Sequence, residues 1–393
     1  MAGEVISVHV GQQLPGHWDA CLVIGGSAPD PGSSATSWRS EVIALLRERW
    51  GGHGRLVVFV PPPGSGARDD AGGELADWYD RAFDVADVVM FWWPDDADPQ
   101  LISTNLAAWN DSQRVVHGTP SYSPQSRYLL KYADRHGIST ATTLAGLVGV
   151  VLDKIGSGAL RAAGEREIPL PVWRTDSFQR WYAAQASAGN TLLGARQVWT
   201  FSTGPDRRFL LYWALHVRVH VRAENRVKSN EVVISRPDIS VLAFYQRGAT
   251  IDDTTVVLVR EFRSPASTPD GLVHELPGGS GSANASALDQ AVGEAEEETG
   301  LAIDIRRIRA HGSRQLAATM SAHHAHLFAA EITGDELAQL RATQSTPHGA
   351  SDNEQTWTEI TTFGQIRESR LVDWATLGMI AEAVLGSATA PPA

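Results

Sequence analysis

Four glutamates stand within five residues directly behind a glycine-rich run. They are Glu294, Glu296, Glu297 and Glu298, in the stretch ELPGGSGSANASALDQAVGEAEEETGL at 275–301. On a helix, Glu294, Glu297 and Glu298 share one face, because residues three and four apart are neighbours. In water each like-charged pair costs only about 0.2–0.5 kcal/mol, as on an ordinary solvated face. If the face turns inward, the repulsion rises to about 4 kcal/mol per pair and requires a cation.

The flanking residues predict the helix that would carry these carboxylates. Ser286 is the expected N-cap, with Asp289 as its capping-box partner, and Gly300 is the expected end of the helix. Magnesium is the natural cation for an inward acidic face, since it takes hard oxygen ligands and bridges to substrate phosphates.

The order of residues around this helix resembles the signature of the Nudix hydrolases. Gly279 is followed by five residues, position 285, seven more residues, position 293 and then Glu294-Ala295-x-Glu297-Glu298-x-Gly300-Leu301. ELPGG at 275–279 is similar to the family's usual lead-in. The resemblance implies a C-terminal α/β/α Nudix sandwich. It also implies a Mg²⁺ (or Mn²⁺) site formed by Glu294, Glu297 and Glu298. Gly278 and Gly279 would contact the substrate.

Two positions depart from the Nudix pattern. Ala285 stands where the family has a glutamate, and Gly293 stands where it has an arginine. The missing carboxylate predicts weaker metal binding, and the missing guanidinium removes a planar donor that would orient a neighbouring carboxylate. The sequence therefore leaves open whether the activity of this domain is weak, retuned or absent.

The segment before the glycine run points to one branch of this family. LVREFRSP followed by HELPGG, at 258–279, resembles the Nudix enzymes that split ADP-ribose and nucleotide sugars. The resemblance implies that Arg260 or Arg263 approaches phosphate, although both are equally compatible with surface ion pairs. It also implies a general base on the polar stretch at 345–360, with Glu354 as the first candidate and Glu359 as the second.

The first 140 residues alternate short β-rich runs such as RLVVFV with helical patterns such as SWRSEVIALLRERW. This alternation predicts a doubly wound parallel sheet, whose ligands lie beyond the carboxyl ends of the strands. The loops at 25–34, 61–66 and 94–100 would rim that cleft. No GxGxxG is present, so the Rossmann mode of dinucleotide binding is not supported.

A second resemblance spans roughly residues 18–155. The stretch WYDRAFDVADVVMFWWPDDADPQLISTNLAAW at 78–109 is similar to the nucleoside 2-deoxyribosyltransferase-like group. The resemblance implies that Asp80 and Asp87 bind sugar hydroxyls or protonate a leaving base, but a structural role, such as a cap at Asp87, is equally compatible. Asn105, in NLAAW, stands where the group has its nucleophilic glutamate, and an amide cannot attack a sugar carbon.

The chain is therefore expected to be an α/β protein in four parts: a deoxyribosyltransferase-like domain at 1–156, a linker with a short helix at 157–196, a Nudix domain at 197–386 and a disordered tail at 387–393. The 45 acidic residues outnumber 33 basic ones, which disfavours a nucleic-acid polymer as partner. Cys21 is the single cysteine, and no apolar run approaches 18 residues. With no signal-peptide pattern at the start, these features predict a cytoplasmic protein without a membrane span.

Together, the two resemblances predict Mg-dependent hydrolysis of the pyrophosphate bond of a nucleoside diphosphate derivative, such as NAD, ADP-ribose or a nucleotide sugar. The N-terminal domain would bind the nucleotide or nucleoside moiety. Two alternatives remain: a bifunctional enzyme that also cleaves the N-glycosidic bond of the resulting nucleoside monophosphate, and a silent nucleotide sensor. The resemblance leaves a homodimer open.

Overall fold

A computed structural model describes residues 3–26, 37–51, 54–62, 72–94, 97, 100, 102, 105–106, 113–120, 124–204, 209–280, 285–349 and 355–386. The contacts within the chain divide it into two compact units, Met1–Ser235 and Arg236–Ala393. The tail at 387–393, most of the three expected cleft loops and Glu354 lie outside the described residues.

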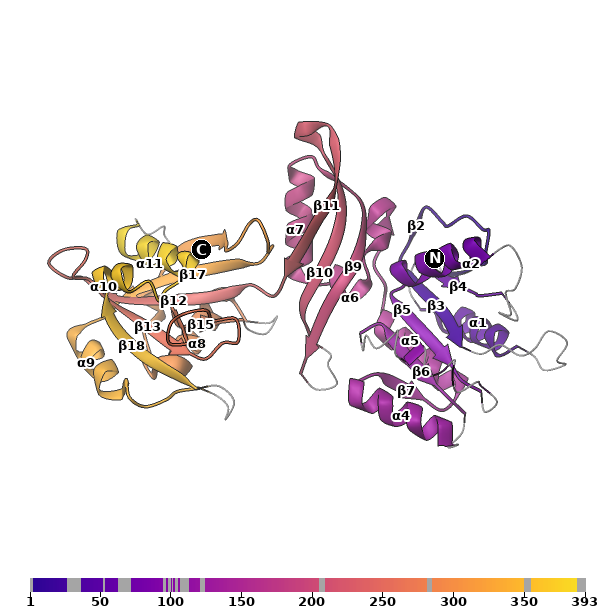
Figure 1. Cartoon of the computed structure of the whole chain (residues 1–393), viewed down its shortest axis with the longest axis horizontal. Coiled ribbons are helices and arrows are strands. Elements are labelled where there is room, and N and C mark those ends of the chain that lie inside the picture. Colours follow the sequence, from indigo (N-terminus) through magenta and orange to yellow (C-terminus); the bar gives the residue numbers. More distant parts are fainter. Residues whose placement is uncertain are drawn as a thin grey trace. The chain divides into compact units, whose positions relative to one another are not determined.

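The N-terminal unit contains a six-stranded sheet in which every pair of neighbours is parallel (Figure 1). Its strands, in spatial order, are β1 (Glu4–Val8), β4 (Arg55–Phe59), β3 (Ala20–Gly26), β5 (Val88–Trp92), β6 (Val115–Gly118) and β7 (Ser139–Ala141). The inner strands are almost wholly apolar because both of their faces are buried.

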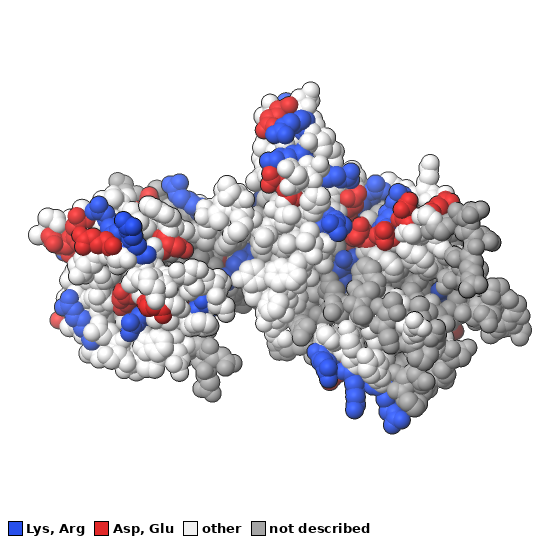
Figure 2. Space-filling view, in the orientation of Figure 1, with Lys and Arg blue, Asp and Glu red and all other residues white. Residues whose placement is uncertain are grey.

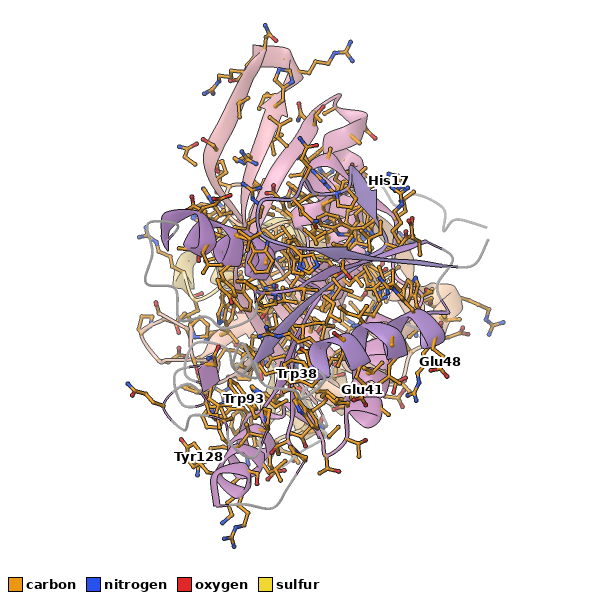
Figure 3. All side chains as sticks on the ribbon, turned by 90° about the vertical axis from the view of Figure 1, so that its right-hand side faces the viewer. His17, Trp38, Glu41, Glu48, Trp93 and Tyr128 are labelled. Carbon is orange, nitrogen blue, oxygen red and sulfur yellow. The ribbon has the colours of Figure 1, made fainter. Side chains whose placement is uncertain are left out.

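Helices cover both faces of this parallel sheet. On one face lie α1 (Trp38–Arg49) and α5 (Leu144–Ile155), and on the other lie α2 (Gly72–Val85) and α4 (Pro124–His136). The α1 helix turns Trp38 toward the sheet and Glu41 and Glu48 toward solvent (Figure 3). The predicted α/β class with a parallel sheet is confirmed.

The same unit holds a second, antiparallel sheet of three strands. It consists of β9 (Thr191–Thr203), β10 (Phe209–Val221) and β11 (Arg226–Ser235), with β10 in the centre. One face is covered by α6 (Leu170–Trp173) and α7 (Asp176–Ser187), through a core that includes Phe178, Trp213 and Leu215.

This three-stranded sheet groups with the N-terminal unit, whereas the sequence pattern assigned it from position 197 to the C-terminal domain. The segment 157–196, predicted as a linker with a short helix, contains helix α7 at that place. It also forms β8 (Arg161–Ala162, paired with β2, His17–Trp18), the short helix η1 (Ala163–Glu167), α6 and the start of β9. The η1 helix packs closely on β9, since a Cβ at Gly164 would lie 2.4 Å from the carbonyl oxygen of Leu192. Strand periodicity gives no sign of this long-range packing.

The C-terminal unit is built on a seven-stranded sheet in which β12 and β17 are parallel and the other pairs are antiparallel. Its strands are β12 (Ile239–Gln246), β13 (Thr255–Glu261), β14 (Val273–Glu275), β15 (Gly278–Gly279), β16 (Arg309–Gln315), β17 (His324–Glu331) and β18 (Thr356–Thr362). One face packs on α8 (Ala287–Thr299) and α9 (Gly334–Thr343), and the other on α10 (Phe363–Ser369) and α11 (Trp374–Leu385).

Two further short helices are η3 (Arg222–Glu224) and η4 (Ile305–Arg307). None of the helices within the described ranges is long and apolar enough to cross a bilayer.

Candidate functional site

The α8 helix begins and ends where its sequence predicts. The Ser286 side chain accepts a hydrogen bond from the Asp289 N–H at 3.1 Å, and Gly300 closes the helix with a left-handed φ of 70°. The Asp289 carboxylate accepts from the Ser286 hydroxyl and not from its backbone N–H, so the expected capping box is half formed. These caps set the two ends of α8, while the burial of Ala291 and Ala295 sets which face of the helix, and so which glutamates, turn toward the sheet.

The four glutamates of α8 differ in burial. Glu298 is only 7% exposed and Glu294 is half-buried, whereas Glu297 and Glu296 are exposed. The acidic face therefore turns partly inward, with Glu298 at its buried edge. Glu298 accepts a hydrogen bond from the Gly278 N–H at 2.9 Å, which ties the carboxylate to β15.

The two glycines of β15 permit this close approach of helix and sheet. A Cβ at Gly279 would lie 2.7 Å from the Glu294 carboxylate, so a side chain there would displace that group. At Gly278 φ is 156°, and a Cβ would lie 2.3 Å from the Ser240 carbonyl oxygen on β12. Gly279 thus makes room for a site side chain, while Gly278 makes room for the backbone of the sheet.

This distinction predicts different outcomes for two neighbouring substitutions. Gly278→Ala is expected to lower the free energy of unfolding by about 1–3 kcal/mol, because its methyl group meets backbone that cannot move aside. Gly279→Ala is expected to cost less stability, because the flexible Glu294 side chain can swing away. Urea denaturation of both variants measures the difference. Equal stability of the two variants would contradict this assignment.

Two further carboxylates, which were not predicted as site residues, join those of α8. Glu261, at the end of β13, is 3% exposed, and Glu275, at the end of β14, is half-buried. Val259 pairs with Glu275 in the sheet, and Glu261 lies two residues beyond Val259, so both glutamates share a face of the sheet. Glu261 lies on the same buried face of β13 as Val257 and Val259, and its position two residues after Val259 was the signal in the sequence that could have revealed it.

Burial and the proximity of other carboxylates shift the pKa values of Glu298 and Glu275 strongly. Burial raises the pKa of Glu298 to about 8, although its hydrogen bond from Gly278 lowers it. Three neighbouring negative charges act in the same direction as burial, those of Glu294, Glu275 and Glu261. Burial also raises the pKa of Glu275 to about 7, with a further contribution from Glu261. We call Glu261, Glu275, Glu294 and Glu298 the carboxylate cluster.

The two arginines proposed for phosphate contact lie in different places. Arg263 forms an ion pair with Glu261, at the edge of the carboxylate cluster, and its side chain remains 49% exposed. Arg260 is exposed and next to Glu261 on β13, so its side chain points to the opposite face of the sheet. Of the two, Arg263 is the arginine that the fold brings to the cluster.

The strand β18 contributes to both faces of this sheet. Thr356 and Thr358 are 0% and 4% exposed, and their hydroxyls have no hydrogen-bond partner among the described residues. Thr356 pairs with Glu261, so it lies on the face of the cluster.

Glu359 lies on the other face of the sheet, where it forms a hydrogen bond with His274 Nδ1 at 2.5 Å. The second candidate for the general base is therefore engaged away from the cluster, and the first, Glu354, is outside the described residues.

In the N-terminal unit, Asp87 is a buried carboxylate that is hydrogen-bonded within the protein. It is 1% exposed, and its two oxygens accept hydrogen bonds from Arg161 at 2.7 and 2.5 Å. They also accept from the backbone N–H groups of Cys21 and Leu170, each at 2.7 Å. With its oxygens occupied by four donors, Asp87 joins β3 and β5 to the segment 161–170 and is not directed at a ligand.

The other two candidates of this unit are helical residues. Asp80 is exposed on α2 and interacts with the charge of Asp84. Asn105 is half-buried and helical, beside Leu106, whose carbonyl oxygen accepts a hydrogen bond from Tyr132. The three residues carried over from the deoxyribosyltransferase resemblance therefore lie in three different settings.

The carboxylate cluster has the chemistry of a cation site. Its donors are hard oxygens, which Mg²⁺ and Mn²⁺ accept. Burial is the main cause of the raised pKa values of Glu275 and Glu298, and repulsion from neighbouring carboxylates adds to it; a bound cation would relieve this repulsion. In the part of the chain that the structure describes, no three His, Cys, Asp or Glu side chains are already arranged as a metal-ligand group. The fit therefore rests on the kind of donor and on its electrostatics.

No known family model matches this sequence, and no curated protein matches it either.

Proposed function

We propose that the C-terminal unit is a magnesium-dependent hydrolase of the Nudix type, which splits the pyrophosphate bond of a nucleoside diphosphate derivative such as NAD, ADP-ribose or a nucleotide sugar. The observation that carries this proposal is the carboxylate cluster of Glu261, Glu275, Glu294 and Glu298 between α8 and the sheet, beside Gly278 and Gly279. The α/β/α layering of this unit, with α8 following the glycine strand β15, is consistent with a Nudix sandwich.

Within this proposal, Glu294, Glu297 and Glu298 would hold Mg²⁺. When bound, the cation would neutralise charge on the diphosphate and lower the pKa of an attacking water. The Gly278 N–H orients Glu298, and the bare Cα of Gly279 leaves room for the Glu294 carboxylate. Arg263, half exposed at the edge of the cluster, is the group in reach of a substrate phosphate.

For the N-terminal unit we propose a deoxyribosyltransferase-like domain that binds the nucleotide or nucleoside moiety. Its parallel sheet with helices on both faces supports this fold. Cleavage of the glycosidic bond has less support, because Asp87 is held by Arg161 and Asn105 stands in the place of the nucleophile. Binding without glycosidic chemistry is the function that these residues favour.

Incubation with ADP-ribose, NAD and nucleotide sugars in the presence of Mg²⁺ tests the proposed hydrolase. Chromatography is expected to reveal a nucleoside monophosphate such as AMP. In the Glu294→Gln/Glu298→Gln variant we expect turnover to fall by about 100-fold or more, which corresponds to about 2.7 kcal/mol of lost transition-state stabilisation. Glu296→Gln is the matched control, because it removes the same charge from the exposed side of the same helix.

The products also separate the alternatives. Free base in addition to AMP would support the bifunctional enzyme, and binding of a nucleotide without any turnover would support the silent sensor. Full activity in the double variant would contradict the proposal, because the chemistry would then depend on other residues.

A further inference from the structure

The N-terminal unit contains a pocket of about 310 Å³ that is rich in arginine. Its charged and polar lining residues are Arg81, Asp84, Glu167, Arg196, His216 and Arg218. They come from α2, from η1 and from the strands β9 and β10, which are far apart in the sequence. Figure 2 shows Lys and Arg side chains beside Asp and Glu side chains where the three-stranded sheet meets the rest of this unit.

The regular geometry of two elements brings the basic groups together. His216 and Arg218 are alternate residues of β10, and His216 pairs with Arg196 of β9, so all three side chains lie on one face of the sheet. The opposite face, with Trp213 and Leu215, is the one covered by α6 and α7. Arg81 and Asp84 are three residues apart on α2, and therefore share a face of that helix.

The carboxylates of the pocket balance only part of its positive charge. Glu167 accepts a hydrogen bond from the Ala195 N–H at 2.9 Å and lies 3.6 Å from Arg218. Burial raises the pKa of Asp84, while the charge of Arg196 lowers it. Arg81 makes no hydrogen bond or ion pair with any residue that the structure describes. Among the lining residues, three guanidinium groups thus face two carboxylates, which leaves this lining with a net positive charge.

A glycine fixes one wall of the pocket. A Cβ at Gly194 would lie 2.3 Å from Nη2 of Arg218 and 2.5 Å from Oε2 of Glu167. The ion pair therefore lies directly over the strand backbone, where any side chain would displace it. His216 is also held in place, because its Nε2 donates to the Ser229 carbonyl oxygen at 2.8 Å.

We propose that this pocket binds a phosphomonoester, such as a sugar phosphate or a nucleoside 5′-monophosphate. Guanidinium groups match the geometry of phosphate oxygens. The positive charges of Arg81 and Arg196 are only partly neutralised by the carboxylates, so these two arginines can bind a phosphate dianion. The volume of about 310 Å³ is at the small end of the range of about 300–1,000 Å³ for ligand pockets, which suits a ligand of this size. This site is separate from the carboxylate cluster and does not depend on the chemistry proposed there.

Isothermal titration of the full-length protein in EDTA tests this site, with ribose 5-phosphate, AMP, inorganic phosphate and acetate as separate ligands. We expect saturable binding of the phosphates and weaker binding of acetate. Arg81→Gln and Arg196→Gln should each raise Kd by about tenfold or more, because each removes charge-assisted hydrogen bonds. Comparison of ribose 5-phosphate with AMP distinguishes a sugar phosphate from a nucleotide as the preferred source of the phosphate.

The matched control is Arg226→Gln, which removes an arginine of the same sheet that pairs with Glu224 outside the pocket. Gly194→Ala is a second probe and should weaken binding by displacing Arg218 without removing a charge. Arg81 and Arg196 are exposed, so their variants are expected to fold. Thermal melting verifies that each variant is folded. Absence of saturable phosphate binding, an unchanged Kd in both arginine variants, or acetate binding as tight as that of phosphate would overturn the proposal.

Discussion

Replacing Asp87 with alanine is expected to lower the free energy of unfolding of the N-terminal unit by about 3–5 kcal/mol. The substitution leaves the guanidinium of Arg161, which is 0% exposed, as a buried charge without its counter-ion. It also removes the acceptor of the Cys21 and Leu170 N–H groups. Breaking a buried ion pair from one side is costly because the remaining charge keeps its full desolvation penalty.

Urea denaturation followed by circular dichroism measures this effect. The Asp87→Ala/Arg161→Leu variant should recover part of the loss, because it removes the stranded charge as well. Asp80→Asn is the control and should change stability by less than about 0.5 kcal/mol, since Asp80 is exposed. A variant Asp87→Ala that is as stable as the wild type but no longer binds nucleosides would instead establish the sugar-binding role that the sequence left open.

Without a divalent cation, the stability of the C-terminal unit is expected to fall as the pH rises from about 5 to above 8. The pKa of Glu298 is about 8 and that of Glu275 about 7 in the folded protein, against an ordinary value of 4.5 when unfolded. The folded state therefore holds these protons more tightly. Their contribution is fully present below pH 4.5 and is lost as the pH passes through about 7 and 8. For Glu298 the loss is on the order of several kcal/mol.

Thermal melting in EDTA between pH 5 and pH 9 measures this dependence. The Glu298→Gln variant should have a shallower decline, because glutamine keeps the neutral form at every pH. Adding Mg²⁺ at high pH should raise the Tm of the wild type more than that of the variant. Glu296→Gln is the control, since Glu296 is exposed and outside the proposed metal site, and its loss should leave the slope unchanged. A flat profile in the wild type, or the same slope in Glu298→Gln, would contradict the prediction.

Local signals in the sequence determined the secondary structure around the candidate site. Ser286 and Gly300 mark the ends of α8, because a capping hydroxyl and a left-handed glycine act within one helical turn. The apolar runs with helical segments between them likewise predicted a parallel sheet with both faces covered, since burial on two faces removes polar alternation. These features depend on neighbours within a few residues.

The tertiary structure alone decided which distant residues meet. Asp87 and Arg161 are 74 positions apart, and no local pattern in either segment predicts that they form an ion pair. Glu261 and Glu275 join Glu298 only because β14 pairs with β13 under α8. The same holds for the sheet of β9–β11, whose alternation marks its strands but not the unit on which they pack. Periodicity specifies which face of an element is buried, whereas the partner of that face is chosen by the packing of the whole chain.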